Sequence, residues 1–321
     1  MRPESTSVTF RPDLAAEVRE YDSAKAAKRF IARKVAPIFE SATCEGGYPI
    51  INRENFKKPV STKRTNRGKY NRITGQFGKG TYDCEENGLE YPVDDRMRRK
   101  YSHILDAEAA AAKIARYQIL LNQEIRVAAA FAAAGLTNTN VATAWSTTAS
   151  AVPLDDIMTQ AENLEDACGI GREWLSLIIP RADYREMMKT DSVVDRVKYV
   201  YGKSVIPALL PVAEVASCLG IKEVLIAAGG YDSKEEGVAE SNTQIWTAGV
   251  IYLGVFCDEG DPLEEPSAAR TILWTGDSPE SPVVESYREE DSRGDIIRVR
   301  HDTDEVMIGE ADLFVRKLTN T

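Results

Sequence analysis

The sequence is poor in the side chains on which most enzymes rely. It contains two histidines, His103 and His301, and neither has a neighbouring nucleophile or a second metal ligand at a useful spacing. It has no GxSxG motif, which would mark a serine hydrolase. The Gly-Lys-Ser at 202–204 resembles the end of a phosphate-binding loop, but Val197 stands where its first glycine belongs. We therefore expect a protein that is not an enzyme, with no catalytic residue, no metal site and no cofactor.

Cysteines are also few, and they are widely spaced, at positions 44, 84, 168, 218 and 257. Their number is odd and no two share a CxxC spacing, which argues against a disulfide framework and against a zinc site. Cys168, Cys218 and Cys257 stand among apolar residues, so we expect them to be core thiols.

Long apolar runs are absent, so we expect a soluble protein with no membrane partner. The segment Met1 to Arg11 lacks the apolar stretch of a signal peptide, and we expect folding in a cytoplasm. The chain has 321 residues, of which 43% are hydrophobic. That is enough for two domains, or for one large domain with extensions.

The net charge of −10 argues against a general nucleic-acid-binding protein, but the charges are unevenly placed. Between Ile51 and Arg72 only Glu54 is acidic. The basic residues of that segment are Arg53, Lys57, Lys58, Lys63, Arg64, Arg67, Lys69 and Arg72. Between Val255 and Asp295 there are twelve acidic residues and three arginines. One hypothesis is that the basic segment of one copy meets the acidic segment of another; the alternative is two independently solvated surfaces.

Residues 1 to about 24 show little periodicity and predict an extended arm with at most one helical turn, and Ala24 to Phe39 predicts a short helix ended by Pro37. Residues 44–93 are rich in glycine and poor in large apolar residues, so this stretch cannot build its own core. Alternating pieces at 48–51 and 70–73 predict a long two-stranded excursion. An isolated hairpin is marginal in water, and we expect this one to lie on a neighbouring copy.

Residues 94–134 lack Gly and Pro and are dominated by good helix formers. They predict a single helix of about 40 residues, or roughly 60 Å. A Thr/Ser-rich linker follows, which we expect to cross between two domains with Trp145 as an anchor. After this linker the sequence predicts a mixture of helices and strands typical of an α/β domain.

In the second half we expect helices at 154–168, 181–190, 192–201 and 212–219, and strands at 174–179, 224–228, 245–256 and 269–274. A closing hairpin is predicted from 295–301 and 306–318, turning at Asp302-Thr303-Asp304.

This order of parts resembles the major capsid protein of tailed bacteriophages, the Hong Kong 97-like fold. The segment EYPVDDRMRRKY, together with the later segment DAEAAAAKIARYQILLNQEIRVAAAF, resembles the entry into the spine helix of that family. WLSLIIPRADYREMMKT and SCLGIKEVLIAAGGYD resemble axial-domain elements, and TQIWTAGVIYLGVF and ARTILWT resemble late strands.

The resemblance implies an α+β fold with an N-terminal arm at 1–43, an extended loop at 44–93 and a compact axial α/β domain at 151–280. Residues 94–150, with the spine helix, would form a peripheral domain completed by the hairpin at 281–321. The eight basic loop residues would then be inter-subunit contacts. Some family members cross-link through a loop lysine, but nothing here identifies the acid that would promote such a bond.

As a function, the resemblance implies self-assembly into pentamers and hexamers of an icosahedral virion capsid in the bacterial host cytoplasm. The partners would be other copies, portal and scaffold proteins, a cement protein in some members, and packaged double-stranded DNA bound nonspecifically. Two alternatives remain: an encapsulin-like nanocompartment shell around an enzyme cargo, and an α/β enzyme whose site the sequence does not reveal.

Overall fold

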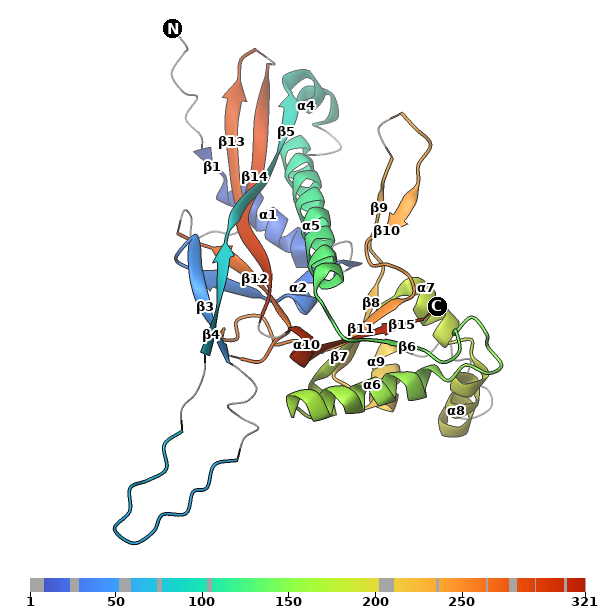
Figure 1. Ribbon diagram of the computed structural model, residues 1–321. Coiled ribbons are helices and arrows are strands. Elements are labelled where there is room, and N and C mark those ends of the chain that lie inside the picture. Colours follow the sequence, from blue (N-terminus) through green and yellow to red (C-terminus); the bar gives the residue numbers. More distant parts are fainter. Residues whose placement is uncertain are drawn as a thin grey trace.

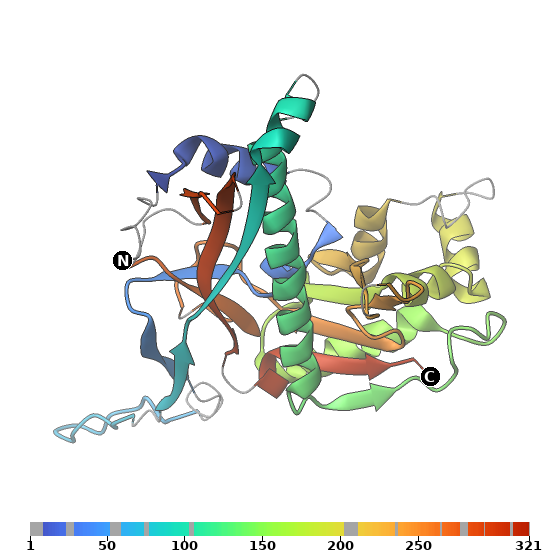
Figure 2. The same cartoon turned by 90° about the horizontal axis from the view of Figure 1, so that it is seen from above.

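The computed structural model describes residues 9–23, 29–51, 59–73, 77–102, 106–201, 211–234, 237–263, 265–276, 282–291, 293–308 and 311–320. Two β-sheets lie on either side of one long helix, and two hairpins project from the body (Figure 1). The view from above shows the same arrangement, with the helix between the sheets (Figure 2). In the described ranges, no helix combines the length and apolar character needed to cross a bilayer.

The first sheet is built around one central strand, β14 (Gly294–Met307). The first half of β14 pairs antiparallel with β13 and its second half with β12, while β5 follows its other edge from Asp94 to Glu85. The other strands of the sheet are β1 (Thr9–Phe10), β2 (Ile38–Ser41), β5 (Glu85–Asp94), β12 (Ala269–Trp274) and β13 (Val283–Glu289).

Helix α5 (Ala107–Ala133) covers this sheet with a face of small residues. Ala109, Ala112 and Ala115 are buried against Ile297 and Val299 of β14, together with Leu14, Ala15 and Val18 of helix α1 (Pro12–Ser23). Alternate residues of a strand share one face, and the alternate positions 297, 299, 301 and 303 of β14 are all buried. Short alanine side chains let the helix backbone approach the sheet closely.

The predicted single helix over 94–134 is wrong. Helix α4 (Asp95–Tyr101) ends at Tyr101, with Ser102 as its C-cap, and Asp106 begins α5 by accepting hydrogen bonds from the N–H groups of Glu108 and Ala109. An aspartate in this position satisfies amide donors that a helix start otherwise leaves open, so it starts a new helix. Helix α5 has 27 residues, which at 1.5 Å per residue is about 40 Å.

The second sheet has the order β6-β15-β11-β7-β8, with apolar residues on both faces. Leu175, Leu177 and Ile179 of β7 face one core, and Ile178 between them faces another. The strands are β6 (Asn138–Asn140), β7 (Leu175–Pro180), β8 (Glu223–Ala227), β11 (Val250–Val255) and β15 (Val315–Thr319). This two-sided burial explains why every residue of β7 is buried and why Ser176 is its only polar side chain.

Helices α6, α8 and α9 contribute to the first of these cores, in which Trp145 is also fully buried, as its predicted anchoring role requires. The helices around this sheet are α6 (Pro153–Cys168), α7 (Arg181–Met187), α8 (Asp191–Tyr201), α9 (Val212–Leu219) and α10 (Ala311–Phe314), with a 3₁₀ turn, η2 (Arg172–Trp174). The other core joins the sheet to α5, where the ring of Phe131 lies 5.4 Å from that of Tyr252.

Three further sequence predictions are corrected by the structure. The arm contains the 12-residue helix α1, whereas the helix predicted at 24–39 is only α2 (Ala32–Val35), followed by strand β2. The predicted closing hairpin is wrong, because Asp302–Asp304 lie inside β14 and β15 belongs to the second sheet. The expected core thiol Cys218 is exposed.

Candidate inter-subunit surface

A two-stranded hairpin is formed by β3 (Glu45–Ile51) and β4 (Phe77–Asp83). The strand predicted at 48–51 lies within β3, whereas the strand predicted at 70–73 is wrong, because those residues form no strand and the return strand is β4. The glycines of the hairpin make room for aromatic rings across the pair. Tyr48 lies opposite Gly80, where an added Cβ would come within 2.2 Å of the Tyr48 ring. The buried Tyr48 also donates a hydrogen bond to the carbonyl oxygen of Met307 at 3.3 Å. The base of the hairpin therefore rests on its own chain.

Strand β5, the last part of the predicted excursion, also lies on its own chain, since it pairs with β14 over its whole length. The expectation that all of 44–93 takes its order from a neighbouring copy is therefore wrong for the base and for β5. It remains a prediction for residues 59–73, beyond the far end of β3 and β4, which extend away from the body in Figure 1.

The hydrogen bonds and the cation–π contact of residues 59–73 described below are local. The Arg64 guanidinium donates to the carbonyl oxygen of Gly68 at 2.7 Å and lies over the ring of Tyr70, 4.7 Å from its centroid. The amide of Asn71 donates to the carbonyl oxygen of Ser61 at 2.6 Å. Arg67 has a φ of 64°, a left-handed conformation that non-glycine residues rarely adopt. We call residues 59–73 the hairpin tip.

The hairpin tip holds five of the eight basic residues predicted as contacts: Lys63, Arg64, Arg67, Lys69 and Arg72. Their side chains are exposed, and within the described part of the chain none of them forms an ion pair. Arg53, Lys57 and Lys58 lie outside the described residues. The structure thus brings together an exposed group of cations, with Tyr70 72% exposed and Ile73 74% exposed among them.

The acidic segment 255–295 does not form one face. Asp258 pairs with Lys222 beside β8, whereas Glu285 on β13 pairs with Arg298 and Arg300 of β14. Asp295 lies near the far end of the first sheet, where it pairs with arginines of its own chain. Several acidic residues that the sequence offered as partners for the basic segment of another copy are therefore already ion-paired within their own chain. Glu259 and Glu265 are exposed and remain candidates for that role.

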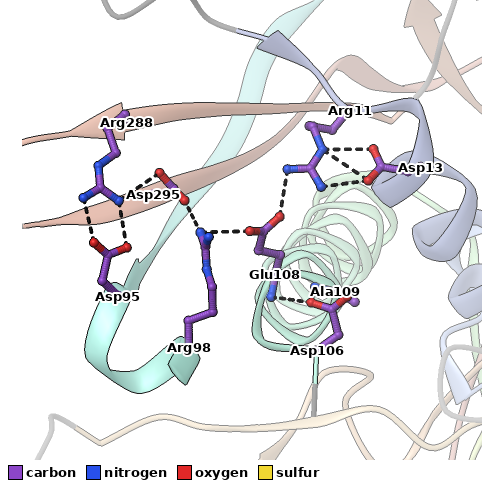
Figure 3. A network of polar contacts seen from close by, with 9 residues as sticks. All are labelled: Arg11, Asp13, Asp95, Arg98, Asp106, Glu108, Ala109, Arg288 and Asp295. Atoms are coloured by element: carbon purple, nitrogen blue, oxygen red, sulfur yellow. Dashed lines mark hydrogen bonds and ion pairs between the residues drawn. The ribbon is translucent and has the colours of Figure 1, made fainter. Parts of the chain in front are cut away.

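A charged network fixes the joint between α4 and α5 (Figure 3). Arg98 on α4 pairs with Glu108 of α5 at 2.9 Å and with Asp295 of β14. Arg288 of β13 pairs with Asp95 at 2.7 Å and lowers the pKa of that carboxyl group. The arginines thus bridge two helices and two strands.

The same network extends to the N-terminal segment. Arg11 donates to Glu108 at 2.8 Å and to Asp13, and it lowers the pKa of Asp13 to about 2.

Three exposed apolar side chains were missed by sequence reasoning. Tyr199 on α8 is 92% exposed, Val238 near the tip of the small hairpin of β9 (Gly230–Asp232) and β10 (Asn242–Gln244) is 58% exposed, and Trp174 is 56% exposed. Trp174 was expected inside a buried strand, but that strand begins at Leu175. Tyr199 could have been found from its place off the buried stripe of Val193 and Val197 on α8.

The histidines do not form a site. His103 lies outside the described residues. His301 is buried in β14 rather than at a turn, and burial, with Arg116 and Arg126 nearby, holds its pKa well below the usual value. Among the described residues, no three His, Cys, Asp or Glu side chains form a group able to hold a metal ion.

No protein-family model matches this sequence, and no curated protein matches it in sequence either. Solved structures do match it in fold. A phage-related protein from Bordetella bronchiseptica superposes with a TM-score of 0.71 at 19% identity, covering 98% of each chain. The capsid of cyanophage P-SCSP1u gives 0.57 at 10% identity, over 89% of this chain and 86% of that one.

A virus-like particle from Pyrococcus furiosus gives a TM-score of 0.54 at 11% identity, over 96% of this chain and 98% of that one. The α+β capsid fold that the sequence resembles is therefore the fold of this chain.

Proposed function

We propose that this protein is the major capsid protein of a tailed bacteriophage, with a structural role and no catalytic turnover. Copies assemble into pentamers and hexamers, which close an icosahedral shell around packaged double-stranded DNA. The observation that carries the proposal is a capsid fold over nearly the whole chain, combined with a basic hairpin tip that projects from the body. A projecting, exposed tip is suited to contact with a neighbouring copy.

Within this proposal the two sheets correspond to two parts of the shell subunit. The first sheet with α1 and α5 is the peripheral part, and the second sheet with α6 to α9 is the axial part around pentamer and hexamer centres. Because strand β15 pairs with β11, we assign it in this proposal to the axial part, whereas the sequence placed it in the peripheral part. The exposed Tyr199, Trp174 and Val238 all project from that part.

The hairpin tip is proposed to contact acidic side chains of an adjacent copy, with Glu259 and Glu265 as candidate partners. A single exposed ion pair contributes only about 0–1 kcal/mol. In a closed symmetric shell the same contact recurs at every subunit, so many weak contacts can act together. The proposed setting is a virion capsid assembled in the bacterial host cytoplasm with portal and scaffold proteins, and DNA bound nonspecifically through its backbone.

Charge reversal in the hairpin tip tests the proposal. Arg64→Glu combined with Arg67→Glu should sharply reduce the particle yield seen by negative-stain electron microscopy, while circular dichroism of the subunit stays unchanged. Arg64→Lys with Arg67→Lys is the matched control, because it keeps both charges but loses the Arg64 contact to Gly68. Full particle yield from the double glutamate variant would overturn the tip contact.

The contents of purified particles separate the capsid from a nanocompartment. Nuclease-protected DNA in particles from infected or induced cells supports the capsid. A single co-purifying enzyme inside small shells would overturn it in favour of the compartment. A chain that forms no particles under any assembly condition would contradict both.

A further inference from the structure

Cys44 and Cys84 lie opposite each other at the base of the extended hairpin. The pairing of β3 with β4 ends at Glu45 and Asp83, and one more hydrogen bond continues it, from the N–H of Cys84 to the carbonyl oxygen of Cys44 at 3.0 Å. Cys84 is the single residue between β4 and β5, which belong to different sheets. The two cysteines therefore mark the point where the hairpin leaves the body.

The backbone of this pair is within reach of a covalent bond. Directly opposed, hydrogen-bonded residues of antiparallel strands have Cα atoms about 5.5 Å apart, inside the range of about 4.4–6.8 Å that disulfides span. Their Cβ atoms lie about 4.5–5.5 Å apart, wider than the roughly 3.5–4.5 Å of a disulfide, so bond formation draws the two strand ends together and turns the Cys84 thiol away from the carbonyl oxygen of Ile272, 3.6 Å from its sulfur. Opposed residues also project their side chains from the same face. The Cys44 sulfur lies 3.3 Å from the carbonyl oxygen of Cys84, and both side chains belong to one apolar cluster with Tyr48 and Ile272.

We propose that Cys44 and Cys84 are an oxidative modification site that forms an intrachain disulfide on exposure to a small disulfide such as glutathione disulfide. The bond would fasten the two ends of the segment 45–83 and fix the hairpin to the body. This site differs from what cysteine spacing alone predicts, since 39 residues separate the pair in sequence.

The reaction proceeds by two thiol–disulfide exchanges. The Cys44 thiolate attacks one sulfur of glutathione disulfide, which forms a mixed disulfide and releases one glutathione. The Cys84 thiolate then attacks the Cys44 sulfur, which forms the protein disulfide and releases the second glutathione. Two protein sulfurs are oxidised, one glutathione disulfide is reduced, and the two thiol protons end on the two glutathione thiols.

Burial orders these steps. Cys44 is half-buried and accessible to a small disulfide, whereas Cys84 is 6% exposed and burial raises its pKa to about 12. Since the thiolate is the attacking species, ring closure should accelerate as the pH rises toward that pKa.

Limited trypsin digestion after oxidation provides a direct test, because the exposed Lys and Arg residues of the hairpin tip lie between the two cysteines. After treatment with glutathione disulfide at pH 8.5 and nicking at the tip, the two fragments should stay joined on a non-reducing gel and separate when reductant is added. Cys44→Ser, at the more exposed position, should give separate fragments under both conditions, and Cys84→Ser provides a second variant.

Mass spectrometry of the intact chain gives a second measurement that does not depend on particle formation. In a Cys218→Ser background, which removes the exposed thiol, the oxidised protein should lose two hydrogen atoms and yield a linked peptide pair containing Cys44 and Cys84. Stable glutathione adducts without a linked peptide, or fragments of the oxidised wild type that separate without reductant, would overturn the proposal.

Discussion

The carboxylate of Glu124, in the middle of α5, accepts a hydrogen bond from the indole N–H of Trp246 at 2.6 Å. Its other oxygen accepts the backbone N–H of Ala32 at 2.6 Å, and Glu124 itself is 0% exposed. One buried side chain thus joins the long helix, the short helix α2 and the segment before β11. Burial raises the pKa of this carboxyl group, while the hydrogen bonds that it accepts oppose that rise.

Glu124→Gln should lower the free energy of unfolding by about 1–3 kcal/mol, because the amide nitrogen would face one of two buried N–H donors. Trp246→Phe removes the indole donor, so Glu124→Gln should lower the free energy of unfolding less in a Trp246→Phe background than in the wild type. Urea denaturation of both single variants and of the double variant measures this coupling. Strict additivity of the two losses would contradict a shared hydrogen bond.

His301 predicts a loss of stability in acid. Its pKa in the folded chain is held well below 6.5 by burial, whereas in the unfolded chain it takes up a proton near that value. The stability it contributes is therefore present above pH 6.5 and falls as the pH drops below 6.5. The difference in unfolding free energy between wild type and His301→Gln should shrink from pH 7 to pH 5.5. A pH-independent difference would show that His301 is not buried in its neutral form.

Local signals predicted much of the second half of the chain. Helix α6 begins at Pro153 and ends before Gly169, whose φ of 72° only glycine adopts readily. Strand β12 has the bounds expected from its apolar run. The residues that start, end and bury these elements lie within the elements themselves. Contacts with other segments of the chain therefore do not alter their bounds.

Elements that depend on distant partners could not be predicted in this way. Asp302-Thr303-Asp304 has the composition of a turn, yet it continues β14 because β5 and β12 supply its backbone pairing and Asp304 accepts the N–H of Asp83. The same holds for the candidate surface. Composition located the basic tip, whereas the contact of Tyr48 with Met307, which holds the hairpin base on its own chain, depends on register.

Gly80→Ala should loosen the hairpin base. An added methyl group would meet the ring of the buried Tyr48 at 2.2 Å, and displacing that ring should cost about 1–3 kcal/mol of local stability. Gly135→Ala is the matched control, since a Cβ there meets nothing within 4 Å. Hydrogen exchange should show faster exchange in β3 and β4 for the first variant alone. Equal protection of β3 and β4 in both variants would show that Tyr48 does not anchor the hairpin.

Two neighbouring arginines of α4 should respond differently to truncation. Arg98 bridges Glu108 and Asp295, whose side chains are 17% and 24% exposed, so Arg98→Ala leaves two half-buried carboxylates short of a partner. We expect a loss of about 1 kcal/mol, at the upper end of the range for such pairs. Arg99, also on the exposed helix α4, forms no ion pair within the described part of the chain, and Arg99→Ala should change stability little.

Salt distinguishes a charge effect from a packing effect. Screening at 1 M ionic strength acts over about 3 Å, so the difference between the Arg98 and Arg99 variants should shrink there. Urea unfolding at low and high salt measures this. A loss in Arg98→Ala that persists unchanged at 1 M salt would mean that the aliphatic part of Arg98, rather than its charge, holds α4 against α5 and β14.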